Sequence, residues 1–150
     1  MTNVNRRTLL GGAAATAALA ASTSVQGHKI TPPASLEGKS ILITGTSSGF
    51  GRLAAEDYAR KGAKVFATMR NLPRPEADEL RALAKSEKLD LHIIEIDVTD
   101  DAQVAAGVAE AERIAGGAID VLINNAGIST AGPIEIQDMA ATQMLFDTNV

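Results

Sequence analysis

The chain has 150 residues, of which 45% are apolar and 21% charged, and its formal net charge is −4. It contains no cysteine, which excludes a disulfide scaffold, a thiolate nucleophile and a Cys-ligated metal centre. Its two histidines, His28 and His92, do not have the spacing of metal ligands. The acidic balance argues against a nucleic-acid partner, which would require a basic face. No apolar run approaches the roughly 20 residues that span a membrane.

The first 27 residues are typical of an export signal rather than of a fold. Up to Gln26, the only charged side chains are Arg6 and Arg7, and the mildly apolar run Leu9–Ala21 follows them. Within this run, Ala18-Leu19-Ala20 has the small-x-small form of a signal-peptidase site. The adjacent arginines resemble a twin-arginine export signal, so we predict a periplasmic protein. The alternative is a disordered or amphipathic tail on a cytoplasmic protein.

Residues 28–36 predict a linker, and residues 37–150 predict the folded domain, in which strand and helix patterns alternate. Short apolar runs predict strands over Ser40–Thr44, Lys64–Met69, Leu89–Ile96 and Val121–Asn124. Helices are predicted over Arg52–Lys61, from Pro75 onward, from a cap at Thr99 or Asp100 to Gly116, and after a cap at Asp138.

This alternation predicts an α/β fold, a doubly wound parallel sheet of Rossmann type with helices on both faces. Four strands in the order 3-2-1-4 would make just over half of such a sheet. The fourth strand would then expose an apolar edge, which natural proteins avoid. We therefore expect the chain to be the N-terminal part of a longer enzyme, or of a truncated gene product, with a domain that is incomplete at its C-terminus.

A glycine-rich loop joins the first predicted strand to the first predicted helix, with Gly45, Gly49 and Gly51 in the segment T-G-T-S-S-G-F-G. Glycines at such a junction allow a tight turn, a close approach of the backbone to a pyrophosphate, and close packing of helix on strand. The helix N-terminus offers free N–H groups to an anion, and Ser47 and Ser48 add hydroxyl donors. A flexible turn without a ligand is the alternative.

Four motifs in order resemble the short-chain dehydrogenase/reductase family. The glycine spacing T-G-x-x-x-G-x-G is followed by Asp97-Val98 after the third strand, by N-N-A-G at residues 124–127 after the fourth, and by Asn149-Val150 at the end of the last helix. The resemblance covers Leu36–Val150. It implies a dinucleotide cofactor and an oxidoreductase that interconverts a small-molecule carbonyl and an alcohol.

The resemblance also implies a role for each matching residue. Gly45, Gly49 and Gly51 would line the pyrophosphate, with Phe50 between the last two, and Asp97 and the Val98 backbone would hold the adenine. Asn124 would tie the fourth strand to the glycine loop, and Asn125, Ala126 and Gly127 would run beside the nicotinamide ribose. Asn149 would complete a proton relay. The alternatives are a simple turn at Asn124-Asn125 and a helix-capping role for Asp97.

The end of the second strand indicates which cofactor is preferred. Family members that prefer NAD place an acid there to bind the ribose 2′-hydroxyl, but this chain has Met69 followed by Arg70. A guanidinium can pair with a 2′-phosphate, which a carboxylate would repel. We therefore predict NADP(H), with NAD less favoured. The alternative is that Arg70 is only a solvated loop charge.

The Ser, Tyr and Lys that complete the family's mechanism would lie beyond Val150 in the family order, so we predict that this chain alone is inactive. The one tyrosine, Tyr58, has Lys61 at the wrong spacing, and its predicted role is packing. A non-catalytic dinucleotide-binding module and an inactive remnant remain the alternatives to an enzyme. The substrate and the direction of reaction are not specified by these residues, and a homo-oligomer is expected for a full-length protein.

Overall fold

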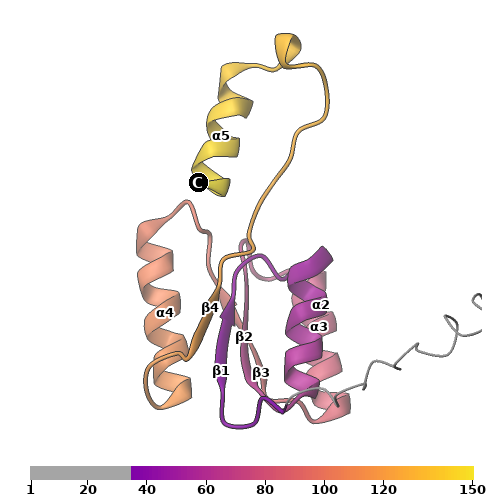
Figure 1. Ribbon diagram of the computed structural model, residues 1–150, viewed down its shortest axis with the longest axis vertical. Coiled ribbons are helices and arrows are strands. Elements are labelled where there is room, and N and C mark those ends of the chain that lie inside the picture. Colours follow the sequence, from indigo (N-terminus) through magenta and orange to yellow (C-terminus); the bar gives the residue numbers. More distant parts are fainter. Residues whose placement is uncertain (1–34) are drawn as a thin grey trace, which may run out of the picture. The chain divides into compact units, whose positions relative to one another are not determined.

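The computed structural model describes residues 35–150 (Figure 1). The predicted export signal and nearly all of the predicted linker lie outside these residues. The described chain forms one four-stranded sheet in the order β3-β2-β1-β4, with bounds β1 Ser40–Ile43, β2 Lys64–Met69, β3 Leu91–Glu95 and β4 Val121–Ile123. Every pairing is parallel. The predicted fold class and strand order are confirmed.

Helices cover both faces of this sheet, as Figure 1 shows. Side chains alternate between the two faces of a strand, so Ile41 and Ile43 pack on one side while Leu42 packs on the other. The helices α2 (Gly49–Arg60) and α3 (Pro75–Glu87) bury their apolar residues on the first side, and α4 (Asp101–Ala115) does so on the second. The chain continues through a 3₁₀ turn at Ile134–Ile136 into α5 (Met139–Asn149).

The predicted helix signals are found at the observed helix ends. Pro75 is the first residue of α3, and Gly116 ends α4 in the left-handed conformation. Of the two candidate caps for α4, Asp100 is the one used, since its carboxylate accepts from the backbone N–H groups of Ala102 and Gln103. Asp138 caps α5 by accepting from the N–H of Ala141.

Helix α2 begins earlier than predicted. The periodicity of apolar residues indicated a start near Arg52, whereas the first helical residue is Gly49, with Ser48 as the N-cap. The last glycines of the loop therefore belong to the first turn of the helix. This early start directs the free N–H groups of the helix at the ends of the strands, where the cavity described below lies.

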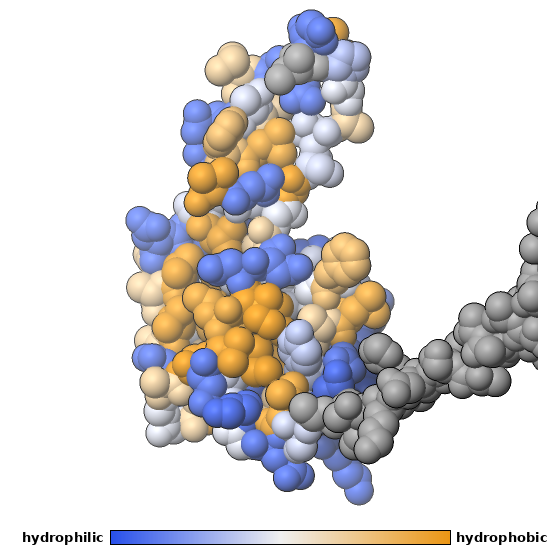
Figure 2. Space-filling view, viewed as in Figure 1, coloured by the Kyte–Doolittle hydropathy of each residue, from blue (hydrophilic) through white to orange (hydrophobic). Residues whose placement is uncertain are grey.

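The C-terminal elements are much more exposed than the others. In β4, Val121 is 41% and Leu122 is 58% exposed, and no residue of α5 is buried. Figure 2 shows apolar side chains gathered over β4 on this face of the molecule. The predicted exposed apolar edge at the fourth strand is thus present among the described residues.

Candidate functional site

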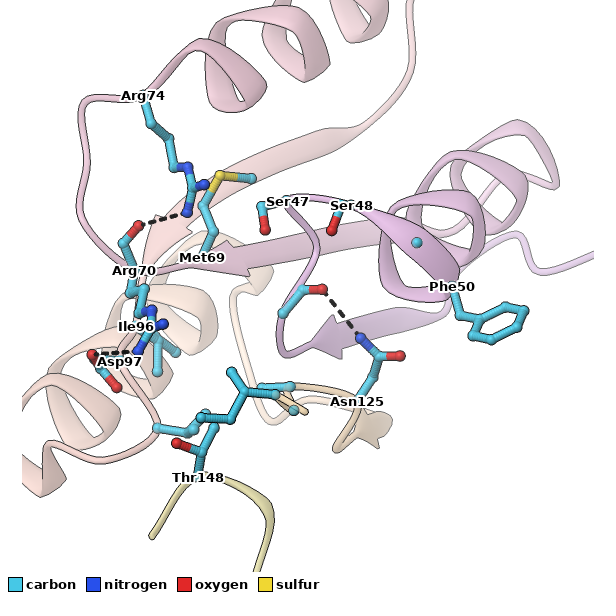
Figure 3. Close-up of a pocket in the computed structure, with 16 residues that line it drawn as sticks. Ser47, Ser48, Phe50, Met69, Arg70, Arg74, Ile96, Asp97, Asn125 and Thr148 are labelled. Atoms are coloured by element: carbon cyan, nitrogen blue, oxygen red, sulfur yellow. Dashed lines mark hydrogen bonds and ion pairs between the residues drawn. The ribbon is translucent and has the colours of Figure 1, made fainter. Parts of the chain in front are cut away.

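A cavity of about 400 Å³ lies at the carboxyl ends of the strands (Figure 3). In parallel α/β sheets this edge is where ligands bind. The cavity brings together most of the predicted site residues: Gly45, Ser47, Ser48, Gly49, Phe50, Arg70, Asp97, Val98, Asn125, Ala126 and Gly127. Two predicted residues, Gly51 and Asn149, are not among the residues that line it. Five further residues complete the lining: Met69, Arg74, Ile96, Ile128 and Thr148.

Gly45 and Gly51 shape the glycine loop by close approach. Gly45 has a φ of +71°, and a Cβ on it would lie 2.6 Å from the Cα of Ala126. A Cβ on Gly51 would collide with the amide of Asn125 and would lie 2.5 Å from the carbonyl oxygen of Gly45. Gly51 thus has the close-packing role expected of one glycine of the loop, and it is not among the residues that line the cavity.

The serines of the loop remain available to a ligand. Ser48 is the N-cap of α2 with an extended backbone, yet its side chain makes no capping hydrogen bond. A hydroxyl at this position normally caps its own helix. Here the Ser47 and Ser48 side chains line the cavity beside the first N–H groups of α2 (Figure 3). The arrangement suits an anionic group.

Asn125 and Thr44 join the glycine loop to the segment after β4. The Asn125 side-chain amide donates to the carbonyl oxygens of Thr44 (2.9 Å) and Gly45 (3.1 Å). In return, the Thr44 hydroxyl accepts from the backbone N–H groups of Asn125 and Ala126, both at 2.9 Å. Assignment of this tie to Asn124 is therefore wrong. Side chains alternate between the two faces of a strand, so Asn125 lies on the same face as Ile123, which packs on the α2 side of the sheet. The side chain of Asn124 would lie on the opposite face.

Asp97 and Arg70 face each other across one end of the cavity. The Asp97 carboxylate accepts from the backbone N–H (3.0 Å) and hydroxyl (2.8 Å) of Thr99, and its other oxygen lies 3.8 Å from the Arg70 guanidinium. These two donors, with the Arg70 charge, hold the pKa of Asp97 below its ordinary value, so the group is ionised at neutral pH. Because Asp100 caps α4, the helix-cap alternative for Asp97 is excluded.

Arg74 is a cavity residue that sequence reasoning missed. Its guanidinium donates to the carbonyl oxygen of Arg70 (3.3 Å) and forms a two-pronged ion pair with Glu76 at 2.9 and 3.0 Å. Figure 3 shows Arg74 beside Met69 and Arg70, at the end of the cavity away from Phe50. The only signal in the sequence was the spacing of Arg70 and Arg74 in the loop that precedes Pro75.

Thr148 and Asn149 bring the end of α5 to the cavity. The Thr148 hydroxyl is buried, lines the cavity, and has no hydrogen-bond partner among residues 35–150. The Asn149 amide bonds twice to the backbone of Ile128: its oxygen accepts from the N–H (2.9 Å) and its nitrogen donates to the carbonyl oxygen (3.0 Å). Asn149 thus fixes the strand-to-loop segment that forms the cavity wall.

Tyr58 is remote from this cavity. It lies in the last turns of α2 and packs, partly buried, against the core beneath α2 and α3. The neighbouring Lys61 is paired with Asp57 at 2.6 Å. The predicted packing role of Tyr58 is confirmed.

A parallel sheet in the order 3-2-1-4, with a glycine loop that leads into a helix at its carboxyl edge, defines a dinucleotide-binding α/β domain. Comparison with known families narrows this class. The short chain dehydrogenase family matches residues 39–150, and the chain belongs to that family, whose members are oxidoreductases. None of the helices in residues 35–150 has the length and apolar character required to cross a membrane.

Individual relatives support this assignment. The chain is 39% identical over 114 residues to retinol dehydrogenase 8 of Bos taurus, covering 74% of this chain and 35% of that protein. It is 40% identical over 116 residues to gluconate 5-dehydrogenase of Gluconobacter oxydans (strain 621H), covering 77% and 44%. A crystal structure of gluconate 5-dehydrogenase from Burkholderia cenocepacia J2315 in complex with NADP and tartrate is also similar, with a TM-score of 0.67 and 33% identity over 77% of this chain and 44% of that one. The chain therefore spans less than half the length of these relatives.

Proposed function

We propose that the protein is an NADP(H)-dependent oxidoreductase that transfers a hydride between the cofactor and a small-molecule carbonyl or alcohol. The observation that carries this proposal is the cavity itself. It combines a helix N-terminus without a side-chain cap, and two serine hydroxyls that have no hydrogen-bond partner among residues 35–150, with a carboxylate and two guanidinium groups at one end. An elongated ligand that bears phosphates and a heterocyclic amine would match these groups in order.

The residues present fit a dinucleotide. The absence of Cβ atoms at Gly45 and Gly51 lets the loop lie against Asn125 and Ala126, which leaves the backbone of the loop open to a pyrophosphate. The buried, unpartnered hydroxyl of Thr148 provides a further donor toward a bound ligand, because buried polar groups are rarely left without a partner. Asp97, ionised at neutral pH, would accept from the exocyclic adenine amine.

A preference for NADP(H) follows from the charges at the end of β2. Met69 occupies the position of the acid in NAD-preferring members, and Arg70 lines the cavity next to it. The gluconate 5-dehydrogenase of Burkholderia cenocepacia was crystallised with NADP, and its likeness to this chain supports the same choice here. A guanidinium forms strong charge-assisted hydrogen bonds with a phosphate.

The proposed chemistry divides between the cofactor and the chain. The nicotinamide, when bound, supplies or accepts the hydride. Residues of this chain bind it and hold its surroundings: Asn125 and Thr44 keep the glycine loop in place, and Asn149 anchors the wall at Ile128. The catalytic Ser, Tyr and Lys of the family would be contributed by sequence after Val150, and Asn149 would position their proton relay.

The cofactor proposal is tested by exchanging the determinants at the end of β2. In the product of the complete gene, Met69→Asp combined with Arg70→Ala should lower the preference for NADP⁺ over NAD⁺ roughly tenfold or more, since a charge-assisted contact is lost and a repulsive carboxylate is added. Dissociation constants for the two cofactors, measured by titration, give the ratio. An unchanged ratio would show that Arg70 does not contribute to the choice between the two cofactors.

We also propose that the protein is exported by the twin-arginine route, on the strength of Arg6, Arg7 and the apolar run after them. Replacement of both arginines by lysine should leave the full gene product in the cytoplasm. Fractionation of cells that express the two forms measures this. Export of the doubly substituted protein would show that the twin-arginine assignment is incorrect.

A further inference from the structure

Arg70 alone does not give this cavity a net positive end. Its guanidinium lies 3.8 Å from the Asp97 carboxylate, and Asp97 is ionised at neutral pH. A 2′-phosphate placed against Arg70 would therefore also feel the repulsion of a carboxylate that lies close to that guanidinium, and this repulsion would offset part of the attraction. A second cation at this end of the cavity would strengthen the proposed discrimination between NADP⁺ and NAD⁺.

Arg74 is placed to be that cation. It lines the same cavity as Arg70, and its guanidinium lies against the Arg70 backbone, where it donates to the carbonyl oxygen at 3.3 Å. The turn that carries both arginines is fixed to the sheet, because the Leu72 N–H donates to the Glu95 carboxylate at 2.9 Å. Arg70 and Arg74 are thus presented on one short, anchored segment.

In this structure the Arg74 guanidinium is already paired with the Glu76 carboxylate. The ion pair is two-pronged, at 2.9 and 3.0 Å, and the side chains are 27% and 35% exposed. Ion pairs this open to solvent are weak, so a phosphate that carries up to two negative charges can compete for the guanidinium. The displaced Glu76 carboxylate would keep other favourable interactions, since it lies in the first turn of α3 and a hydrogen bond from its own backbone N–H also lowers its pKa.

We propose that Arg74 is a second determinant of NADP(H) preference, and that Glu76 pairs with Arg74 until a 2′-phosphate displaces the Glu76 carboxylate. This inference rests on the proposed function, since it concerns the same dinucleotide site. It assigns opposite effects to two neighbouring residues: Arg74 favours the phosphorylated cofactor, and Glu76 opposes it by competition. A merely structural ion pair would give both residues effects of the same sign.

The test uses the product of the complete gene and measures dissociation constants for NADP⁺ and NAD⁺, with 2′-AMP and 5′-AMP as smaller probes. Arg74→Ala should weaken NADP⁺ and 2′-AMP roughly tenfold and leave NAD⁺ and 5′-AMP within about twofold. Arg74→Lys keeps the charge but lacks the planar guanidinium that donates two parallel hydrogen bonds, so it should recover part of the lost NADP⁺ affinity. Glu76→Gln should tighten NADP⁺ by about twofold to fivefold, because the competitor is gone.

Matched controls come from the same helix. Arg81 and Asp78 form an equivalent pair at 3.0 Å on α3 but do not line the cavity, so Arg81→Ala and Asp78→Asn should leave both cofactors unaffected. Retained NAD⁺ affinity in every variant shows that the fold survives. Equal weakening of NADP⁺ by Arg74→Ala and Glu76→Gln, or no change in either, would overturn the proposal.

The outcomes also separate this inference from the function on which it rests. If Met69→Asp with Arg70→Ala shifts the cofactor ratio while Arg74→Ala does not, the proposed function stands and the role of Arg74 is refuted. If the unaltered protein binds none of the four probes, the proposed function itself is refuted and the inference fails with it.

Discussion

The half of the sheet built from β1 and β2 differs sharply from the part built from β4 and α5. All four residues of β1 are buried, as are five of the six residues of β2, and α2, α3 and α4 cover them. In contrast, β4 is half exposed and no residue of α5 is fully buried. The first region owes its stability to apolar burial. The second is joined to the first by the short pairing of β4 with β1 and by hydrogen bonds from Asn125 to the glycine loop and from Ser40 to Asp120. Within the second region, Asn149 ties α5 to Ile128.

This contrast suggests that the two regions tolerate different substitutions. Substitutions in the packed region should mainly change the free energy of unfolding, and substitutions in the hydrogen-bonded region should mainly change turnover or cofactor affinity.

Loss of the Asn149 side chain should have the greatest consequence. Asn149→Ala removes both hydrogen bonds to Ile128 and with them the fixed wall of the cavity. In the product of the complete gene we expect turnover to fall by ~10²–10⁴-fold, the range for loss of a general acid–base element, and cofactor affinity to fall far less. Steady-state kinetics and cofactor titration measure the two quantities.

Gln143→Ala is the matched control, since Gln143 lies on the same helix and bonds only to Asp147 at 2.6 Å in the described residues. It should change neither quantity. A loss of cofactor affinity as large as the loss of turnover would mean that Asn149 serves binding, and the division between the two regions would then be drawn in the wrong place.

Truncation of two leucines compares the two regions directly. Leu80 is fully buried between α3 and the sheet, whereas Leu122 in β4 is 58% exposed. Leu80→Ala should lower the free energy of unfolding by about 2–5 kcal/mol, and Leu122→Ala by no more than about 0.5 kcal/mol. Denaturant titration of both variants gives the values. A cost at Leu122 equal to that at Leu80 would show that β4 is covered in the complete protein.

Acid should weaken the junction between the two regions. Asp120, just before β4, accepts from the backbone N–H (2.8 Å) and hydroxyl (2.9 Å) of Ser40 at the start of β1, and these donors with Lys39 lower its pKa. Because the folded-state pKa is lower than the unfolded one, this contribution to stability is present above about pH 4 and is lost as the pH falls through the folded-state value.

The comparison of the native protein with Asp120→Asn measures this effect. The native protein should be the more stable at pH 7, and the difference in midpoint denaturant concentration should shrink below about pH 4. A difference that stays constant from pH 7 to pH 3 would contradict ionisation as the source of the effect.

The sequence predicts the packed region better than the cavity. Strand order and helix ends follow from alternation, glycine spacing and capping residues such as Asp100, which act locally. The tie at Asn125 was assigned to Asn124 from the family resemblance. The residues alone do not show which of the two adjacent asparagines faces the glycine loop, because this depends on the exact register of β4, which ends at Ile123. Arg74 was missed because its place in the cavity depends on the path of the loop after β2. The unpartnered hydroxyl of Thr148 was missed because it depends on how α5 packs against distant segments.

The bond between Asn125 and the glycine loop also has a consequence for the order of synthesis and folding. The residues that it joins are 80 and 81 positions apart, so the loop leaves the ribosome well before its partner does. At roughly 5–20 residues per second, that delay is on the order of ten seconds. We expect a nascent chain to acquire its cofactor only after β4 has paired with β1, and ribosome-stalled chains that end before β4 to retain none.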